Sequence, residues 1–200
     1  MIDSLEKSKV VPNEPIWRLT VAQYHEIIQA GILTPDDTLE LLEAWLITKM
    51  TKNPHHTLST QLLNDALRPV IPSGWIINNQ EPITTADSEP EPDISIIRGK
   101  RRDYIDRHPY PEDIALVIEV SDATLQRDRT LKLRIYANAR IPVYWIINLQ
   151  QRQVEVYTEP TGEEEQATYQ QEKIYQESDS VPIIIGDKEL GKIIVADILA

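Results

Sequence analysis

A single carboxylate interrupts the most apolar stretch of the chain. Residues 114–120 read Ile-Ala-Leu-Val-Ile-Glu-Val, which is typical of a strand buried on both faces, and Glu119 falls inside this run. A carboxylate buried without a partner is costly, so a metal ion, an arginine or a lysine must compensate its charge. The alternative is that the strand ends here and water solvates the side chain. Glu119 is therefore the first candidate for a functional residue.

A second carboxylate, Asp93, stands at the expected start of another strand. Pro90 and Pro92 cannot lie within a central ladder, so the strand begins after Pro92. Two carboxylates at adjacent ends of neighbouring strands form a suitable oxygen pair for Mg²⁺, which takes few protein ligands and keeps several waters. The alternative is that Pro92-Asp93 is only a turn, a common role for this pair of residues.

The elements that must position these carboxylates alternate between helix and strand. A capping box at Thr20 and Gln23 predicts a short helix that Gly31 ends, and apolar residues at helical spacing predict helices over 54–70 and 131–139. Extended segments are expected after Trp75 and after Pro92, and over 39–50, 114–120, 143–147, 153–158, 168–175, 181–185 and 192–195. This order predicts an α/β fold, with a mixed sheet flanked by helices and an extra C-terminal β segment.

Length and composition limit the class of protein. A chain of 200 residues fits one domain, and we expect a flexible N-terminal arm at 1–16, which is polar and contains two prolines, before a single domain over 17–200. Cysteine is absent, which excludes disulfides and thiolate ligands. The sequence shows neither a signal-peptide layout nor an apolar run of the ~18–20 residues that span a membrane. We therefore expect a cytoplasmic protein without a membrane partner.

The formal net charge of −12 argues against a general nucleic-acid coat, because such proteins attract the polyanion with lysine and arginine. A local basic patch is compatible with this total. The alternative for any such cluster is an ordinary solvated face. The best candidates for a patch are Arg98, Lys100, Arg101, Arg102, Arg127, Arg129 and Arg134.

Four segments follow one another with local chemistry that is specific in combination. They are Pro92-Asp93, Glu119-Val120 at the end of the apolar run, Asp-Arg-Thr-Leu-Lys-Leu-Arg-Ile-Tyr-Ala at 128–137, and Val-Tyr-Trp-Ile-Ile at 143–147. In these segments, and from about Arg18 to the C-terminus, the chain resembles the Uma2 family. That family is mostly bacterial, is expanded in cyanobacteria and is assigned to the PD-(D/E)xK restriction-endonuclease-like superfamily.

The resemblance implies a metal site for Mg²⁺ or Mn²⁺. Asp93 and Glu119 would be its carboxylate ligands, and the backbone carbonyl of Val120 a further ligand. Glu40 matches a glutamate of the family's N-terminal hairpin and would be auxiliary, as would His56 at the start of the second helix. For both auxiliary residues the alternative is a purely local role.

The resemblance also assigns the lysine of the site. The usual superfamily lysine stands two residues after the glutamate, where this chain has Ser121. Uma2-like sequences instead carry a lysine in the following helix, which here is Lys132. The first turns of a helix that leaves the strand can overlook the same site, and the long stem can place the ammonium beside the scissile phosphate. The alternative is an i,i+4 surface pair with Asp128.

Three departures from the family pattern stand out. Ala44-Trp45 replaces a common Gly-Glu, Ser121-Asp122 replaces Ser-Pro, and Asn148 replaces an aspartate. None involves the two carboxylates, so we expect an altered hairpin turn rather than a lost site.

These expectations combine into one functional hypothesis. The chain would be a metal-dependent endonuclease that hydrolyses DNA phosphodiester bonds with Asp93, Glu119 and Lys132, and a homodimer is plausible by analogy of fold. One alternative is a catalytically inactive nucleic-acid-binding or scaffold protein with the same fold. Another is an unrelated interaction domain whose acidity serves a basic partner. The weaker nucleic-acid contacts would be Arg98, Lys100, Arg101 and Arg129.

Overall fold

A six-stranded sheet organises the part of the chain that the structure, a computed structural model, describes: residues 14–34 and 36–200. Strands β5 and β6 pair in parallel, and every other neighbouring pair in this sheet is antiparallel. The mixed α/β sheet predicted from the sequence is thus confirmed. In spatial order the strands are β3 (Trp75–Asn79), β4 (Ile94–Arg98), β5 (Ile114–Ser121), β6 (Val143–Asn148), β7 (Gln153–Thr161) and β8 (Thr168–Gln176).

Two hairpins accompany the sheet. Strands β1 (Leu39–Leu42) and β2 (Trp45–Thr48) form the first, and its two turn residues, Glu43 and Ala44, have φ values of 47° and 66°. A turn with positive φ values favours glycine. Ala44, which replaces the glycine of the family pattern, therefore adopts a strained backbone conformation. Strands β9 (Ser180–Ile185) and β10 (Lys188–Ile194) form the second hairpin, which is the extra C-terminal β segment.

The first two helices begin at the residues that the sequence predicts, and each follows a capping side chain. Helix α1 (Val21–Gln29) starts after Thr20, whose side chain and that of Gln23 complete the capping box. Helix α2 (Pro54–Leu67) starts after Asn53, whose side chain accepts a hydrogen bond from the backbone of His56. The N-terminal arm expected at 1–16 lies, up to residue 13, outside the described residues.

The third helix begins earlier than predicted. The expected start at 131 is wrong, because helical structure already begins with α3 (Leu125–Arg127) and continues through a π-helical turn, Asp128–Lys132, into α4 (Leu133–Asn138). The polar residues of this first part obscured the helical period. None of the described helices is long and apolar enough to cross a membrane.

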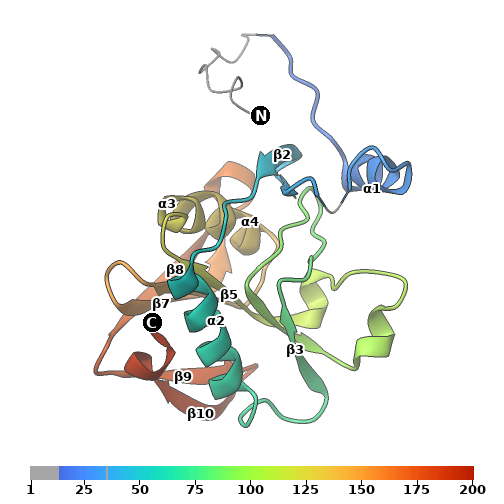
Figure 1. Cartoon of the computed structure of the whole chain (residues 1–200). Helices are drawn as coiled ribbons and strands as arrows, with labels where there is room; N and C mark the ends of the chain where they lie inside the picture. Colours follow the sequence, from blue (N-terminus) through green and yellow to red (C-terminus); the bar gives the residue numbers. More distant parts are fainter. Residues whose placement is uncertain (1–13, 35) are drawn as a thin grey trace.

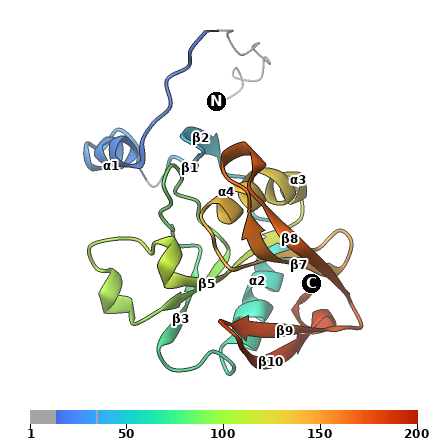
Figure 2. The same ribbon diagram turned by 180° about the vertical axis from the view of Figure 1, so that it is seen from behind.

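Alternation along β5 separates two hydrophobic clusters, one on each face of the sheet. Leu116, Ile118 and Val120 face the cluster that includes α2 and the β9–β10 hairpin, which lie side by side in Figure 1. Val117 faces the opposite cluster, which includes α4, drawn close to β7 and β8 in Figure 2. Because side chains alternate along a strand, Glu119 points toward α4. All eight residues of β5 are buried, which agrees with the buried strand expected over 114–120 and not with the alternative of a solvated Glu119.

A polar network joins the π-helical turn to the sheet. Glu155 on β7 is fully buried and accepts two hydrogen bonds from Arg129, at 2.6 and 2.9 Å. Asn148 and Tyr157 also donate to it, at 2.7 and 2.9 Å. Burial alone would raise the pKa of Glu155, but these donors hold it below its ordinary value. The network therefore anchors the helical segment that carries Lys132.

Replacing this carboxylate tests the anchor. We expect Glu155→Gln to lower the free energy of unfolding at neutral pH by about 2–4 kcal/mol, measured by urea denaturation, because a partly buried guanidinium loses its partner. Because the folded pKa is depressed, this stability is present above the unfolded value of about 4.5 and disappears as pH falls through the folded value. The difference in unfolding free energy between the wild type and Glu155→Gln should therefore disappear in acid. The exposed Glu159→Gln serves as the control, and equal loss in both variants would contradict the anchor.

Candidate active site

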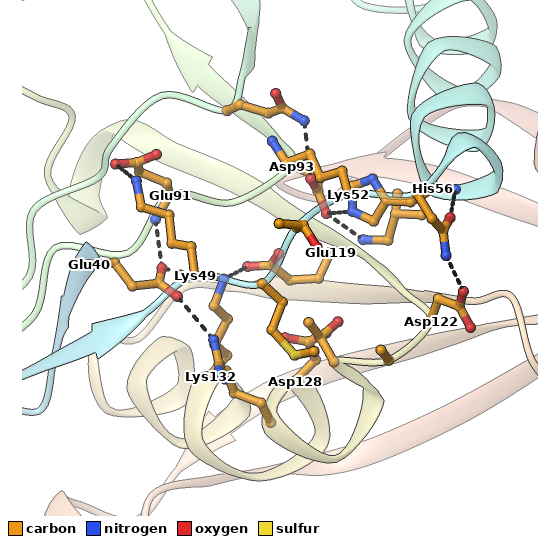
Figure 3. Close-up of a pocket in the computed structure, with 18 residues that line it drawn as sticks. Glu40, Lys49, Lys52, His56, Glu91, Asp93, Glu119, Asp122, Asp128 and Lys132 are labelled. Atoms are coloured by element: carbon orange, nitrogen blue, oxygen red, sulfur yellow. Dashed lines mark hydrogen bonds and ion pairs between the residues drawn. The ribbon is translucent and has the colours of Figure 1, made fainter. Parts of the chain in front are cut away.

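A charged cleft opens where β4 begins and β5 ends. The β1–β2 hairpin, the start of α2 and the α3 segment form its walls (Figure 3). Its basic side chains come from Lys49, Lys52, Arg127 and Lys132, with His56 beside them. Its carboxylates are Glu40, Glu91, Asp93, Glu119, Asp122 and Asp128, so we call it the acidic cleft.

Two neighbours fix Oδ2 of Asp93 at the entrance of β4, and Gln80 Nε2 donates a hydrogen bond to its Oδ1 at 3.4 Å. Its Oδ2 accepts a hydrogen bond from the backbone N–H of Val120 at 2.9 Å, and His56 Nε2 lies 3.1 Å from the same oxygen. Burial opposes ionisation of this carboxyl, but His56, the Val120 N–H and Lys132 together hold its pKa below the ordinary value. Asp93 is therefore a preformed anion against the end of β5.

Glu119 and Lys132 form a buried ion pair. Lys132 Nζ lies 2.9 Å from Glu119 Oε1, and the Tyr136 hydroxyl donates to the same oxygen at 2.6 Å. Glu119 is 4% exposed and Lys132 6% exposed, so water screens this pair little. Among the described residues, none donates a hydrogen bond to Oε2 of Glu119. One oxygen of the carboxylate is thus committed, and the other stays available to a ligand.

A carboxylate of the β1–β2 hairpin lies on the other side of Lys132. Glu40 Oε2 lies 3.6 Å from Lys132 Nζ and accepts a hydrogen bond from the backbone of Glu91. Arg127 Nη1 lies 3.7 Å from Glu40 Oε1. Lys132 therefore sits between carboxylates from β1 and β5, and this arrangement brings three distant segments of the chain together.

Burial and the opposite charge of the partner act against each other on the pKa values of both Glu119 and Lys132. Burial raises the pKa of Glu119 well above the ordinary range, and Asp128 and Asp93 add to this while Lys132 opposes it. Burial alone would lower the pKa of Lys132, but the carboxylates around it raise the value instead. Lys132 is therefore a persistent cation, and Glu119 is a carboxylate that gains from any further positive charge nearby.

A π-helical turn places Lys132 at this position. The turn spans Asp128–Lys132 and both of its end residues are buried. Asp128 accepts a hydrogen bond from Ser121 at 2.7 Å, which holds the turn to the end of β5. Single π turns within helices are frequent at functional sites because they redirect side chains. The surface pair considered for Asp128 and Lys132 does not describe this geometry, since both side chains face inward.

The six residues predicted to hold the metal, to catalyse or to assist line the cleft, as does Arg127 of the predicted basic patch, whereas the four weaker nucleic-acid contacts do not. Arg98 stands at the opposite end of β4 from Asp93, roughly 16 Å away at the rise of a strand, and its guanidinium lies over Trp75. Lys100 and Arg101 follow Arg98 in the chain, and Arg129 is held by Glu155. The residues in the cleft are Glu40, His56, Asp93, Glu119, Val120 and Lys132.

Sequence reasoning missed several members of the cleft. Tyr136, which contacts Glu119 without lining the cleft, lies four residues after Lys132, and this helical spacing places both on one face, so the signal was present in the sequence. Lys49, Lys52 and Asp122 lie in connections between elements, where no periodicity marks them.

The cleft offers hard oxygen donors. No group of three or more His, Asp or Glu side chains within residues 14–34 and 36–200 is arranged to hold a metal ion. Mg²⁺ needs only one or two carboxylates, because it keeps several of its waters. The free Oε2 of Glu119 and the ionised Asp93 fit such an ion. The added positive charge would also lower the pKa of Glu119, which burial raises.

Comparison with known proteins agrees with the resemblance seen in the sequence. The family model of Uma2, described as "Putative restriction endonuclease", matches residues 21–185, which confirms the family prediction. The chain is also similar to a solved structure from Anabaena variabilis, titled a "putative nuclease belonging to DUF820". The two are 16% identical, the match covers 90% of this chain and 97% of that chain, and the TM-score is 0.58, so the likeness concerns the fold. No protein with a curated description matches the chain.

Removing the buried ammonium tests the electrostatics of the cleft. We expect Lys132→Met to lower the free energy of unfolding by about 3–5 kcal/mol at neutral pH, because Glu40 and Glu119 lose the cation between them. Adding Glu40→Gln should recover at least ~1 kcal/mol, since one of the two uncompensated charges disappears. Urea denaturation measures both values, with the exposed Lys188→Met as control. A loss no larger than that of the control would show that the pair is not a buried ion pair in solution.

Proposed function

The chain belongs to the Uma2 family, and we propose on that premise that it is a Mg²⁺- or Mn²⁺-dependent nuclease that hydrolyses DNA phosphodiester bonds in the acidic cleft. One observation carries the proposal. Lys132 from a helix meets Glu119 from a strand at 2.9 Å, in the same cleft as the ionised Asp93. Two carboxylates and a lysine around one cleft match the donors that metal-assisted phosphodiester hydrolysis requires.

Asp93 and Glu119 would hold the cation, and the Val120 carbonyl would be a further ligand. When bound, such an ion polarises the phosphate and lowers the pKa of a bound water. Asp93 is ready for this role because His56 and the Val120 N–H already fix its Oδ2. Glu119 offers Oε2, since Lys132 and Tyr136 occupy Oε1.

Lys132 would act as a hydrogen-bond donor and a fixed positive charge. The carboxylates around it raise its pKa and so favour the protonated ammonium, which donates hydrogen bonds. It would orient the attacking water and stabilise the negative charge that develops on the phosphate oxygens. Glu40 and Tyr136 would be positioning residues, because they act through Lys132 and Glu119.

Cleavage assays with single variants test the proposal. We expect Asp93→Asn, Glu119→Gln and Lys132→Met each to lower the rate of cleavage of labelled DNA by ~100-fold or more, because each removes charge that the transition state needs. A chelator should abolish the activity, and Mg²⁺ or Mn²⁺ should restore it.

The exposed Asp65→Asn variant, on α2 and outside the cleft, is the matched control and should cleave like the wild type. Cleavage that survives Glu119→Gln would assign the activity to a contaminant and remove the proposed role of this residue.

Calorimetry tests the cation site separately from turnover. We expect the wild type to bind Mn²⁺ at the cleft and Asp93→Ala to lose most of that affinity, since the pair of oxygen donors is broken. Binding that Asp93→Ala leaves unchanged would remove the proposed site. Binding by a wild type that cleaves no DNA would instead favour a non-catalytic member of the family.

A further inference from the structure

We propose that the substrate of the acidic cleft is an unpaired nucleic-acid strand, such as a single strand or a frayed arm, rather than an intact duplex. This inference rests on the proposed nuclease function and narrows it. Its basis is the depth of the reacting groups, the bridges that join the cleft walls and the distribution of charge around the opening.

The groups proposed to act on the phosphate lie below the surface. Asp93, Glu119 and Lys132 are each no more than 6% exposed. The cleft beside them has a volume of about 100 Å³, so it admits a small group but not a duplex. Phosphates of a duplex are held on a stiff helix, so groups that are recessed in a pocket reach them less readily than they reach a phosphate of a flexible strand.

Two hydrogen bonds join the walls of the cleft. Asn53, at the start of α2, donates to Asp122 Oδ2 after β5 at 2.6 Å. Arg127 of α3 donates to the carbonyl of Thr48 at the end of β2 at 3.2 Å. Both bridges tie the segment 48–53 to the opposite wall, and residues 49–53 of this segment line the cleft (Figure 3). We call this segment the roof.

The roof also carries two of the basic side chains that line the cleft. Lys49 is paired with Glu91 at 2.6 Å, whereas Lys52 forms no ion pair with any residue that the structure describes. Lys52 is therefore the side chain available to a phosphate that neighbours the scissile one. A single such contact suits a flexible strand, which can bend to bring each phosphate to it in turn.

The net charge of the chain also favours a single strand over a duplex. The chain carries a formal net charge of −12, and a duplex concentrates one negative charge per roughly 1.7 Å of its axis. Repulsion is therefore stronger for a duplex than for a single strand, whose charge density is lower. The basic residues Arg98, Lys100 and Arg101, which could offset this, stand at the far end of β4 from the cleft.

Cleavage of matched oligonucleotides tests the inference. One labelled strand is offered alone, fully paired, and as the unpaired arm of a fork, with Mn²⁺ and full-length protein. We expect the single strand and the fork arm to be cut about tenfold faster or more than the paired strand, since a flexible strand can bend to place one phosphate in the recessed cleft. Equal or faster cleavage of the duplex would overturn the inference and leave the nuclease proposal intact.

The roof itself is tested by Asp122→Ala, which removes one bridge without touching the cap that Asn53 provides to α2. We expect the preference for the single strand to shrink by at least about threefold as the walls separate, whereas Asp65→Ala, at an exposed aspartate outside the cleft, should leave it unchanged. A preference that Asp122→Ala does not alter would show that the roof does not select the substrate. Thermal unfolding checks that both variants fold.

A binding measurement separates the two proposals. Fluorescence anisotropy with the same oligonucleotides, without divalent ions and with Asp93→Asn protein, does not depend on turnover. Tighter binding of the single strand, weakened by Lys52→Ala, would support the substrate class even if no preparation cleaves DNA, a result that would overturn only the nuclease proposal. Tighter binding of the duplex would overturn the substrate class.

Discussion

The buried ion pair between Glu119 and Lys132 is the interaction on which the rest of the cleft depends. Taking two charges out of water is expensive, and their attraction repays this only when the geometry is good and further hydrogen bonds satisfy them. Here Tyr136 donates to Glu119, and Glu40 lies on the other side of Lys132. A hairpin, the central strand and the third helix must therefore all be in place before the pair is stable, and the cleft forms only in the complete fold.

The same requirement explains features that look unrelated. The parallel contact of β5 with β6 needs a crossover, and the crossover is the helix that carries Lys132. The π-helical turn points this lysine inward, and Glu155 anchors the turn through Arg129. Asn148, which replaces an aspartate of the family pattern, is a neutral donor to Glu155 and so belongs to this anchor. The site is thus supported by residues far from its opening.

Much of this could be predicted from the sequence, because local chemistry determined it. The capping box at Thr20, the apolar run around Glu119 and the prolines before Asp93 each report on their own segment, and the structure has the helix and strands that they predict. The early start of the third helix could not be predicted, because its polar residues face a cleft that long-range contacts create. The roles of Glu40 and of the roof also depend on pairings between distant segments, such as the 2.6 Å bond from Asn53 to Asp122, and no local period encodes them.

The central claim is that the ion pair keeps one oxygen of Glu119 available to a cation shared with Asp93. Anomalous diffraction from crystals soaked in Mn²⁺ tests it most directly, because the peak locates the ion without reference to activity. We predict a peak bonded to oxygen atoms of both Asp93 and Glu119, with Lys132 still in the cleft. A well-ordered cleft without a peak, or a peak bound only by other carboxylates such as Glu91 and Asp122, would contradict the account.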